Sequence, residues 1–471
     1  MAEPIRPSAV RAPRAKPFLF PQLCKGCGRC IGACPKHCIA FEDEVDPRTG
    51  LIPVHVDLEL CNGCGLCITA CPEPYGLESL GVGEAPAEVA IPEPTGLSLP
   101  PATADVPDEC LPLAARQPLA IKGAHASAIG ALLAGCRHFY GYPITPSTEG
   151  SELMARLLPE IGGVFVQAVS EVAAINHLYG CGGAGLRGMT FTSSPGFSLM
   201  LEGLSYMIGA EVPAVVVNVM RGGPGLGNIG PEQTDIKLAC RGLGHGNTHA
   251  IVLAAASPQE MLDLSMLSFE LAFKYRNPVI LLADGYLGQM TGKVDLPPYF
   301  VKPGLPGWAV WGDREHRGNL ICSIFLAEPD LEAHNLRLLA KYERMVAAEQ
   351  RAERWRMDDA EVVLVACNTP ARMAKGAVEA LRERGVAAGL FRPITLWPFP
   401  IQALLPSLPR TRKLVVVEAS PGQLEDELRL AVSRAGAPLP PLESVQRYGG
   451  IIPSTEEIVR RVLETREEVA S

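Results

Sequence analysis

Residues 24–35 read CKGCGRCIGACP and residues 61–72 read CNGCGLCITACP, and these two stretches decide the fold of the N-terminal part of the chain. In each stretch, three cysteines are spaced so that one short loop can wrap a compact metal cluster, and a fourth cysteine follows just before a proline. Glycines such as Gly26 and Gly63 let the backbone approach the cluster without a clash from a Cβ atom. Zinc knuckles would show two Cys-x-x-Cys pairs instead. We therefore predict two clusters held by eight thiolates.

This spacing is typical of small proteins with two 4Fe-4S clusters, in which the fourth cysteine of each run ligates the cluster of the other run. We expect residues 1–80 to form a small α+β domain of the bacterial ferredoxin type, with a hairpin between the two runs. Such a domain transfers single electrons. The predicted ligands are Cys24, Cys27, Cys30 and Cys71 for the first cluster, and Cys61, Cys64, Cys67 and Cys34 for the second.

Length and composition set limits on the rest of the chain. The 471 residues are enough for about three domains, and a formal net charge of -9 argues against nucleic-acid binding, which needs a basic face. No run approaches the ~20 apolar residues of a membrane span. Thiolate clusters and unpaired cysteines are typical of a reducing compartment, so we expect a cytoplasmic protein whose other cysteines are buried free thiols. These are Cys38, Cys110, Cys136, Cys181, Cys240, Cys322 and Cys367.

Beyond the cysteine runs, the composition predicts a linker and two α/β domains. A stretch rich in Pro, Ala and Glu is typical of a stiff, extended tether rather than a packed element. Near-continuous apolar runs, such as 214–220 and 278–283, predict strands that are covered on both faces of a parallel sheet. The expected regions are the ferredoxin domain at 1–80, the linker at 81–118, an α/β domain at 119–297, a connecting segment at 298–357 with a helix at 330–354, and a second α/β domain at 358–471.

The segment 138–149, HFYGYPITPSTE, lies where a predicted strand ends and a helix begins. Pro146 suits the first turn of a helix. Helix N-termini at the carboxyl ends of strands are natural anion sites in open α/β sheets, so a substrate carboxylate would fit here, with Thr145 donating its hydroxyl. An ordinary helix cap explains the same residues equally well.

Two further helix starts carry candidate side chains. Glu171 begins an otherwise apolar helix, and on the residues alone its interaction with the helix dipole is the better explanation. The stretch 191–207 opens with small hydroxyl and glycine residues, which let backbone N–H groups approach a ligand. A capped helix start without a ligand fits that stretch as well.

A glycine-rich loop follows the apolar run 214–220. Its sequence GLGNIG at 225–230 formally matches the dinucleotide fingerprint, but a proline interrupts the turn and no acidic residue ends a second strand about 20 residues later. Arg221 is either a two-pronged clamp for a carboxylate or a solvated surface side chain. His245, between two glycines, is either an acid/base or structural, and Asp284 marks a plain strand-end turn.

Taken together, these segments resemble the α subunit of the 2-oxoacid:ferredoxin oxidoreductases over residues 121–458. Any one of the matching strings is weak, whereas all five in the family's order are specific. They are YPITPS at 142–147, TSSPG at 192–196, MRGGPGLG at 220–227, GHG at 244–246 and RPITLWPFP at 392–400.

The resemblance implies a transketolase-like pyrimidine-binding domain followed by a transketolase C-terminal-like domain. It also implies that Glu171 bonds the aminopyrimidine of thiamine diphosphate and favours the tautomer that removes the thiazolium C2 proton, which reverses the helix-dipole interpretation. Thr145 and Arg221 resemble the residues that hold the 2-oxoacid carboxylate. The further cofactor-binding residues are Ser194, Pro195 and Gly196.

The implied reaction is the oxidative decarboxylation of a 2-oxoacid to acyl-CoA and CO2, with two electrons leaving one at a time through the 4Fe-4S clusters. The sequence lacks the Gly-Asp-Gly and distant asparagine that hold magnesium diphosphate in this cofactor family. We therefore expect a β subunit that supplies this site, with or without a proximal cluster, together with a γ subunit and ferredoxin or another acceptor. Such cluster modules are commonly separate subunits, so the fusion here departs from the family pattern.

The substrate is less sharply implied than the reaction. The strings at 192–196 and 220–227 look most like branched-chain 2-oxoacid members, with 2-oxoglutarate and aryl (phenylglyoxylate-like) members as alternatives. A 2-oxoglutarate enzyme needs a second cation, for which His245 is a weak candidate. Two other classes are a non-catalytic iron–sulfur electron carrier, against which Glu171 and Arg221 argue, and a nicotinamide dehydrogenase, which rests on the discounted fingerprint.

Overall fold

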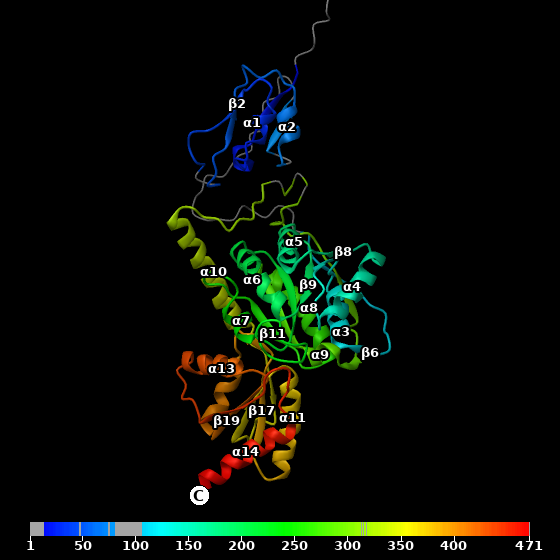
Figure 1. The fold of residues 1–471 in the computed structure, drawn as a ribbon, viewed down its shortest axis with the longest axis vertical. Coiled ribbons are helices and arrows are strands. Elements are labelled where there is room, and N and C mark those ends of the chain that lie inside the picture. Colours follow the sequence, from blue (N-terminus) through cyan, green and yellow to red (C-terminus); the bar gives the residue numbers. More distant parts are fainter. Residues whose placement is uncertain are drawn as a thin grey trace, which may run out of the picture. The chain divides into compact units, whose positions relative to one another are not determined.

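The computed structural model consists of two compact units (Figure 1). One unit contains Met1–Ala102 with Ile324–Ala333, and the other contains Thr103–Ser323 with His334–Ser471. The residues that the structure describes are 14–46, 49–73, 76–80, 106–311, 313, 315–316 and 318–470. Within those ranges, no helix has the length and apolar content needed to cross a membrane.

The first unit is a small α+β domain built around the two cysteine runs. Its helices begin directly after glycines in the left-handed conformation, because α1 (Arg29–Ala33) follows Gly28 at φ 69° and α2 (Leu66–Ala70) follows Gly65 at φ 76°. A side chain at either position would strain the backbone. The described strands are β1 (Lys16–Leu19) antiparallel to β4 (Leu77–Leu80), and β2 (Ile39–Phe41) antiparallel to β3 (Val54–Val56). The β2–β3 pair confirms the hairpin predicted between the runs.

The second unit contains a seven-stranded sheet in the order β18-β11-β12-β10-β9-β7-β8. All neighbouring strands are parallel except β18, which runs antiparallel to β11. The central strands β10 and β12 are buried along their whole length, as their apolar runs predict. The bounds are β7 (His138–Gly141), β8 (Val164–Gln167), β9 (Gly188–Thr192), β10 (Ala214–Met220), β11 (Ile251–Ala254), β12 (Pro278–Asp284) and β18 (Thr395–Trp397).

Helices pack against this sheet in two pairs, α3 with α8 and α5 with α6 (Figure 1). Helices α5, α6 and α8 follow the carboxyl ends of β8, β9 and β11, so their N-termini gather at one edge of the sheet, whereas α3 follows β6 (Leu119–Lys122), which lies outside this sheet. The bounds are α3 (Gly123–Leu133), α4 (Thr148–Glu160), α5 (Glu171–Gly183), α6 (Ser194–Gly209), α7 (Ile236–Arg241), α8 (Pro258–Tyr275) and α9 (Gly285–Gln289).

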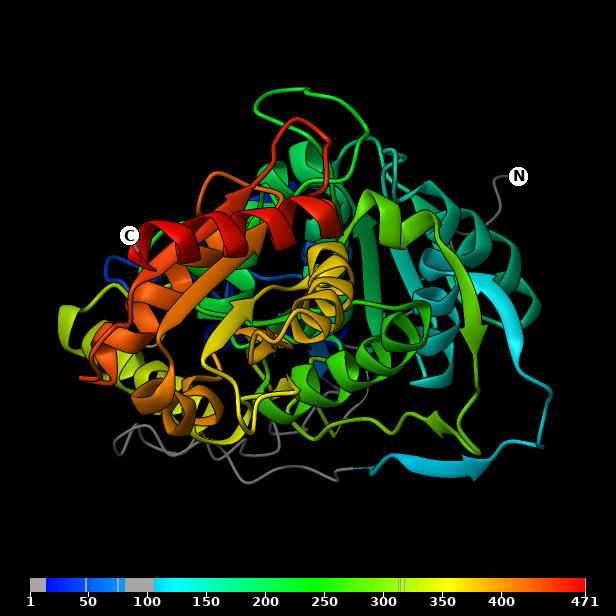
Figure 2. The same cartoon turned by 90° about the horizontal axis from the view of Figure 1, so that it is seen from below.

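A second sheet of five strands follows in the order β15-β17-β16-β19-β20, with only β15 antiparallel to its neighbour. It is the red-to-yellow part of Figure 2, where α14 crosses in front of the strands. Its strands are β15 (Ala352–Trp355), β16 (Val362–Val365), β17 (Ala388–Pro393), β19 (Lys413–Glu418) and β20 (Leu442–Gln446). The helices of this region are α11 (Asn368–Glu383), α12 (Ile401–Leu404), α13 (Gln423–Arg434) and α14 (Thr455–Ala470), whereas α10 (Glu328–Ala348), which precedes β15, bonds to residues of the first α/β domain.

Two segments pair differently from the sequence expectation. Part of the stretch predicted as an unpacked linker forms β5 (Glu109–Pro112), which pairs with β14 (Tyr299–Lys302); the rest of that stretch before residue 106 lies outside the described residues. Strand β6 (Leu119–Lys122) pairs in the same way with β13 (Thr291–Val294). Strand β18, from the region expected as the second α/β domain, completes the first sheet instead. The chain therefore connects the two sheets, because β18, which follows β17 of the second sheet, hydrogen-bonds to β11 of the first.

Candidate functional site

The first predicted set of cluster ligands lines one small cavity in the first unit. Its wall contains Cys24, Cys27 and Cys30 from the first run and Cys71 from the second, which is the crossed combination. Burial, and then the charges of Cys24 and Cys71, raise the pKa of Cys30 to about 11. Iron must therefore displace the thiol protons when it binds. Apolar side chains close the cavity, among them Leu19, Val54 and Leu77.

The second set is identified by mutual proximity of its thiols. Burial, and then the charges of Cys61 and Cys64, raise the pKa of Cys67. Cys34 belongs with them through Cys38, whose Sγ lies 3.3 Å from that of Cys34 and whose pKa is raised to about 12 by burial and then by Cys34 and Cys61. Sequence reasoning treated Cys38 as a scattered buried thiol. The structure places this fifth thiol beside the second set.

No group of three or more His, Cys, Asp or Glu side chains in the described ranges surrounds a single metal ion. The cysteines instead enclose a space, with thiols arriving from both runs. That arrangement fits a multi-iron cluster, whose ligands are spaced more widely than those of one ion.

In the second unit, the candidate residues lie at the carboxyl ends of neighbouring strands. Thr145 follows β7, Glu171 follows β8, Ser194 follows β9 and Arg221 follows β10. Parallel strands place these ends on one edge of the sheet, so residues far apart in sequence meet there. Several helix N-termini and loops lie at this edge, as expected for a ligand site.

Glu171 is buried at this edge, with 5% of its surface exposed. None of the described side chains or backbone groups donates a hydrogen bond to its carboxylate. The carboxylate lies against Gly196, where an added Cβ would collide with Glu171 Oε1 and with the hydroxyl of Thr192. The Glu171 oxygens are not among the fully enclosed unpartnered atoms of the described residues, so the carboxylate stays open to a ligand at the sheet edge, and glycine is needed to make room for it. The arrangement fits a ligand that donates a proton or hydrogen bond to Glu171.

Arg221 connects two of the other candidates. Its guanidinium donates to the Thr145 carbonyl oxygen at 2.8 Å and to the Leu226 carbonyl oxygen at 3.1 Å, while its Nε is buried without a partner. Its backbone N–H donates to Ser194 Oγ at 3.1 Å. Thr145 is exposed, and its hydroxyl bonds to none of the described residues. Arg221 is thus held against the backbone of Thr145, on the sheet edge where a carboxylate could bind.

The remaining candidates divide into one exposed and one buried residue. His245 is exposed, in a turn whose Gly244 packs on α6. Asp284 was expected in a plain strand-end turn, but it is wholly buried, and its carboxylate accepts from the Tyr286 and Leu287 N–H groups and from Thr369. Sequence reasoning missed this role because Thr369 lies in the other α/β domain.

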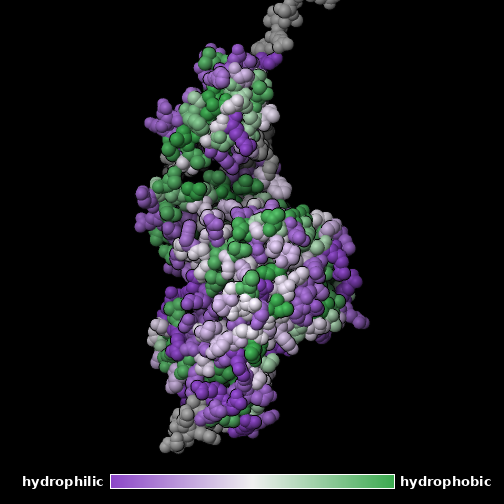
Figure 3. All heavy atoms as spheres, viewed as in Figure 1, coloured by the Kyte–Doolittle hydropathy of each residue, from purple (hydrophilic) through white to green (hydrophobic). Residues whose placement is uncertain are grey.

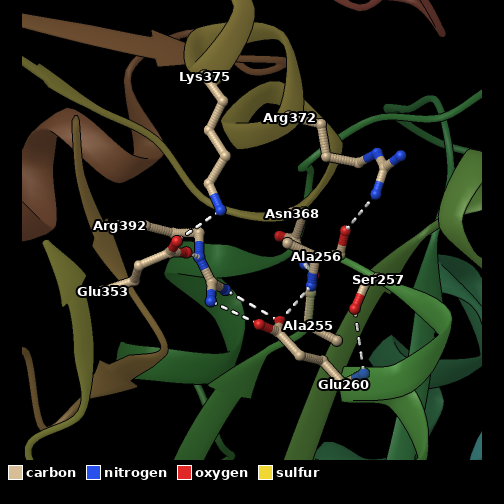
Figure 4. Close-up of polar contacts among 9 residues, drawn as sticks. All are labelled: Ala255, Ala256, Ser257, Glu260, Glu353, Asn368, Arg372, Lys375 and Arg392. Carbon is tan, nitrogen blue, oxygen red and sulfur yellow. Dashed lines mark hydrogen bonds and ion pairs between the residues drawn. The ribbon is translucent and has the colours of Figure 1, made fainter. Parts of the chain in front are cut away.

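A polar junction also joins the two sheets of this unit, beside a cavity of about 290 Å³ (Figure 4). Arg392, from the string at 392–400, donates to both oxygens of Glu260 at the start of α8 and to Glu353 on β15. Glu353 also accepts from Lys375 on α11, at 2.5 Å. Arg392 is 3% exposed, so its charge is compensated by these two carboxylates. This family string is therefore structural, since it fixes one domain against the other.

Known families match three parts of the chain. "Pyruvate flavodoxin/ferredoxin oxidoreductase, thiamine diP-bdg" matches residues 129–305, "Pyruvate:ferredoxin oxidoreductase core domain II" matches 360–458, and "4Fe-4S dicluster domain" matches 23–74. Ketoisovalerate oxidoreductase subunit VorB of Methanothermobacter thermautotrophicus is 46% identical over 73% of this chain and 97% of its own length. The chain belongs to the 2-oxoacid:ferredoxin oxidoreductase family. The resemblance in the five strings is thereby confirmed.

Two further members of the family show its range. The 2-oxoglutarate synthase subunit KorA of Methanocaldococcus jannaschii is 35% identical over 73% of this chain and 98% of its own length. The solved structure of 2-oxoglutarate:ferredoxin oxidoreductase from Magnetococcus marinus, with 2-oxoglutarate, coenzyme A and succinyl-CoA bound, superposes with a TM-score of 0.65 at 26% identity. The similarity covers 74% of this chain and 65% of that one. These matches confirm the predicted fold class.

Proposed function

We propose that this chain is the α-type subunit of a thiamine diphosphate-dependent oxidoreductase that converts a 2-oxoacid and coenzyme A to acyl-CoA and CO2. Two electrons pass one at a time through two 4Fe-4S clusters to ferredoxin or another acceptor. The observation that carries the proposal is the carboxylate of the largely buried Glu171, which accepts no hydrogen bond from the described residues and lies against Gly196 on the same sheet edge as Thr145 and Arg221.

The side chains present fit the aminopyrimidine part of the cofactor. When bound, thiamine diphosphate supplies a carbon nucleophile and an electron sink for decarboxylation. Glu171 would hold a proton at a ring nitrogen, because none of the described residues competes for its carboxylate. Gly196 provides the space for this contact, and Ser194 and Pro195 open the helix beside it.

Thr145 and Arg221 would bind the substrate carboxylate. The guanidinium already reaches the Thr145 carbonyl oxygen, so the cation lies beside the residue that carries the hydroxyl. A charge-assisted hydrogen bond to a carboxylate is among the stronger polar contacts, and the planar arginine fork orients it. This pair would fix the 2-oxoacid with its keto carbon toward the cofactor.

We propose a branched-chain 2-oxoacid as the substrate. VorB, named for ketoisovalerate, is more similar to this chain than KorA is, at 46% against 35% identity. Lys122, close to the Thr145 turn through Gln289, is paired with Glu149 at 3.3 Å, so its charge is compensated. A second carboxylate, as in 2-oxoglutarate, would need an uncompensated cation. The KorA relatives nevertheless keep 2-oxoglutarate as the second candidate.

Partner subunits would complete the site. We propose a β subunit that carries the magnesium and diphosphate site, a γ subunit, and a cytoplasmic location, which the many reduced thiols support. The candidate edge exposes large apolar side chains of the kind that partners cover. These are Val169 at 88%, Leu226 at 80% and Ile229 at 63% exposure, and apolar residues are mapped in green in Figure 3.

The test is a panel of 2-oxoacids assayed with coenzyme A and a low-potential dye, using the chain co-expressed with its partner subunits. The panel contains a branched-chain 2-oxoacid, 2-oxoglutarate, phenylglyoxylate and pyruvate. We expect the highest kcat/KM with the branched-chain acid. A higher value with 2-oxoglutarate would overturn the substrate, and a lack of coenzyme A-dependent dye reduction with every acid would overturn the activity.

A further inference from the structure

Asp284 joins three segments that are distant in the sequence. Its Oδ1 accepts from the Tyr286 N–H at 3.1 Å, the Leu287 N–H at 2.9 Å and the Thr369 hydroxyl at 2.8 Å. Its Oδ2 accepts from the Thr369 N–H at 2.8 Å. The carboxylate thus caps α9 and, with the same two oxygens, holds the first turn of α11 in the second α/β domain.

Helix α9 in turn touches the turn that carries Thr145. A Cβ added at Gly285 would lie 3.3 Å from Pro146 Cγ and 3.2 Å from the Ile229 carbonyl oxygen, so the helix start packs closely against both. At its other end, Gln289 donates to the Pro146 carbonyl oxygen at 3.4 Å. The turn after β7 therefore rests on α9 at both ends of this helix.

The same helix start also contacts the Arg221 loop. The built Cβ at Gly285 would lie 3.6 Å from Pro231 Cα, and Pro231 forms an isolated β-bridge with Arg221. The two residues proposed to hold the substrate carboxylate, Thr145 and Arg221, thus lie on loops that share one support. That support begins at the residue directly after Asp284.

We infer that Asp284 is a positioning residue for the 2-oxoacid carboxylate site, because it ties the second α/β domain to the helix on which the Thr145 and Arg221 loops rest. The inference rests on the proposed function, since it concerns the substrate that this site would bind. It gives the second α/β domain a role in the reaction through Thr369, whose hydrogen bonds go to Asp284 rather than to the candidate site.

The physical consequence concerns binding more than chemistry. If the support loosens, the Thr145 hydroxyl and the Arg221 guanidinium lose their fixed separation, and the carboxylate is held less tightly in the ground state and the transition state alike. Such uniform weakening raises KM and leaves kcat nearly unchanged. A general loss of folding would instead lower the amount of active enzyme.

The decisive variant is Asp284→Asn in the full complex with its partner subunits. The amide oxygen at the Oδ1 position can still cap α9 and accept from the Thr369 hydroxyl, but the amide N–H2 then faces the Thr369 N–H, so two donors oppose each other and this second bond to α11 is lost. Thr369→Val is the milder second variant, because it removes only the hydroxyl. The matched control is Asn368→Gly, which deletes the neighbouring bonds to the Ala255 and Leu282 carbonyl oxygens and the bond accepted from Gln233, but keeps both bonds between Thr369 and Asp284.

We expect Asp284→Asn to raise the KM for the 2-oxoacid about tenfold and Thr369→Val to raise it less, with kcat and the KM for coenzyme A close to wild type. Asn368→Gly should leave all three unchanged. Amide hydrogen exchange supplies a readout that is independent of turnover: protection of residues 142–148 and 285–289 should fall in Asp284→Asn and not in Asn368→Gly.

Other outcomes overturn the inference. Equal changes in Asp284→Asn and Asn368→Gly would mean that the junction is only structural, and an unchanged KM in both Asp284→Asn and Thr369→Val would mean that α9 does not position the site. If Asp284→Asn does not fold, an unchanged KM in Thr369→Val is sufficient to reject the inference about Asp284. Arg221→Lys tests the proposed function separately: an unchanged KM there would show that the carboxylate site itself is misassigned, and the inference would fall with it.

Discussion

The ferredoxin unit and the α/β unit assemble their functional side chains in different ways. In the ferredoxin unit, three predicted ligands of each cluster lie in a single run, and only the fourth is predicted to come from the other run; the cavity lined by Cys24, Cys27, Cys30 and Cys71 is consistent with this for the first set. In the α/β unit, Thr145, Glu171 and Arg221 come from three different strand ends and meet only because the strands are parallel neighbours. Local spacing therefore determines the first site, whereas sheet topology determines the second.

The comparison predicts that the two sites can be disabled independently, and the largest effect should come from Glu171. Replacing Glu171 with Gln in the full complex should lower kcat by about 10³-fold, within the range for a lost general acid–base group. The cluster signals in electron paramagnetic resonance should remain, because the first unit is untouched. Glu152→Gln, an exposed carboxylate on α4, is the control. Turnover of Glu171→Gln within tenfold of wild type would show that this residue is not catalytic.

The crossed ligation in the first unit can be broken with paired substitutions. Cys24→Ser combined with Cys71→Ser removes two ligands of the same predicted cluster, so about four of the eight irons should remain. Cys24→Ser combined with Cys34→Ser damages both clusters, and almost no iron should remain. Iron and sulfide determination on the purified protein distinguishes the two. The reverse result would show that each run binds its own cluster with all four cysteines.

These differences also explain what the sequence could predict. The cysteine sets, the β2–β3 hairpin and the buried strands β10 and β12 depend on spacing and on apolar runs, which are properties of short segments. The α/β site was found through strings that resemble a known family, because the residues alone left Glu171 as a helix-dipole partner. The fold class thus followed from local patterns, but the site did not.

Contacts between distant segments could not be predicted from the sequence, because they depend on how the whole chain folds and not on short segments. Trp397 lies in a strand that joins the other domain's sheet, and nothing in its neighbours along the chain indicates that partner. Asp284 resembles any aspartate at a strand end until Thr369 is placed beside it. Cys38 falls outside the repeated spacing and is recognised only by its distance from Cys34.

The stability of the α/β unit should depend on pH, and Glu418 is the residue that tests this. Burial raises the pKa of Glu418 to about 7, and hydrogen bonds from Ser420 and from the Leu424 and Glu425 N–H groups only partly oppose this. The unfolded value is about 4.3, so the folded state binds more protons between these values. Stability should therefore fall as pH rises from about 4.5 to 7, by a few kcal/mol at most.

Thermal unfolding of the complex between pH 5 and 8 measures this slope. Glu418→Gln should flatten it, because the replaced group no longer titrates, even where the variant is less stable overall. Glu383→Gln, an exposed carboxylate at the end of α11, should keep the slope. An unchanged slope in Glu418→Gln would show that another group controls the pH dependence.

The smallest expected effect is that of replacing Cys38. This thiol lies in the first unit but outside the repeated cysteine spacing. Its Sγ lies 3.3 Å from Cys34 Sγ, and the residue is 4% exposed, so water does not separate the two. Once Cys34 is a thiolate ligand, the Cys38 thiol can donate a weak hydrogen bond to it. Hydrogen bonds to cluster sulfurs favour the reduced, more negative cluster and raise its potential.

Replacing Cys38 with Ala should therefore lower the midpoint potential of the second cluster and leave that of the first unchanged, as measured by a redox titration followed by electron paramagnetic resonance. Cys38→Ser retains a donor and should shift the potential less. Cys110→Ala, an exposed thiol in the other unit, is the control and should have no effect. An equal shift of both clusters would indicate a change in the whole fold of the first unit, because only Cys34 and Cys61 of the second set adjoin Cys38.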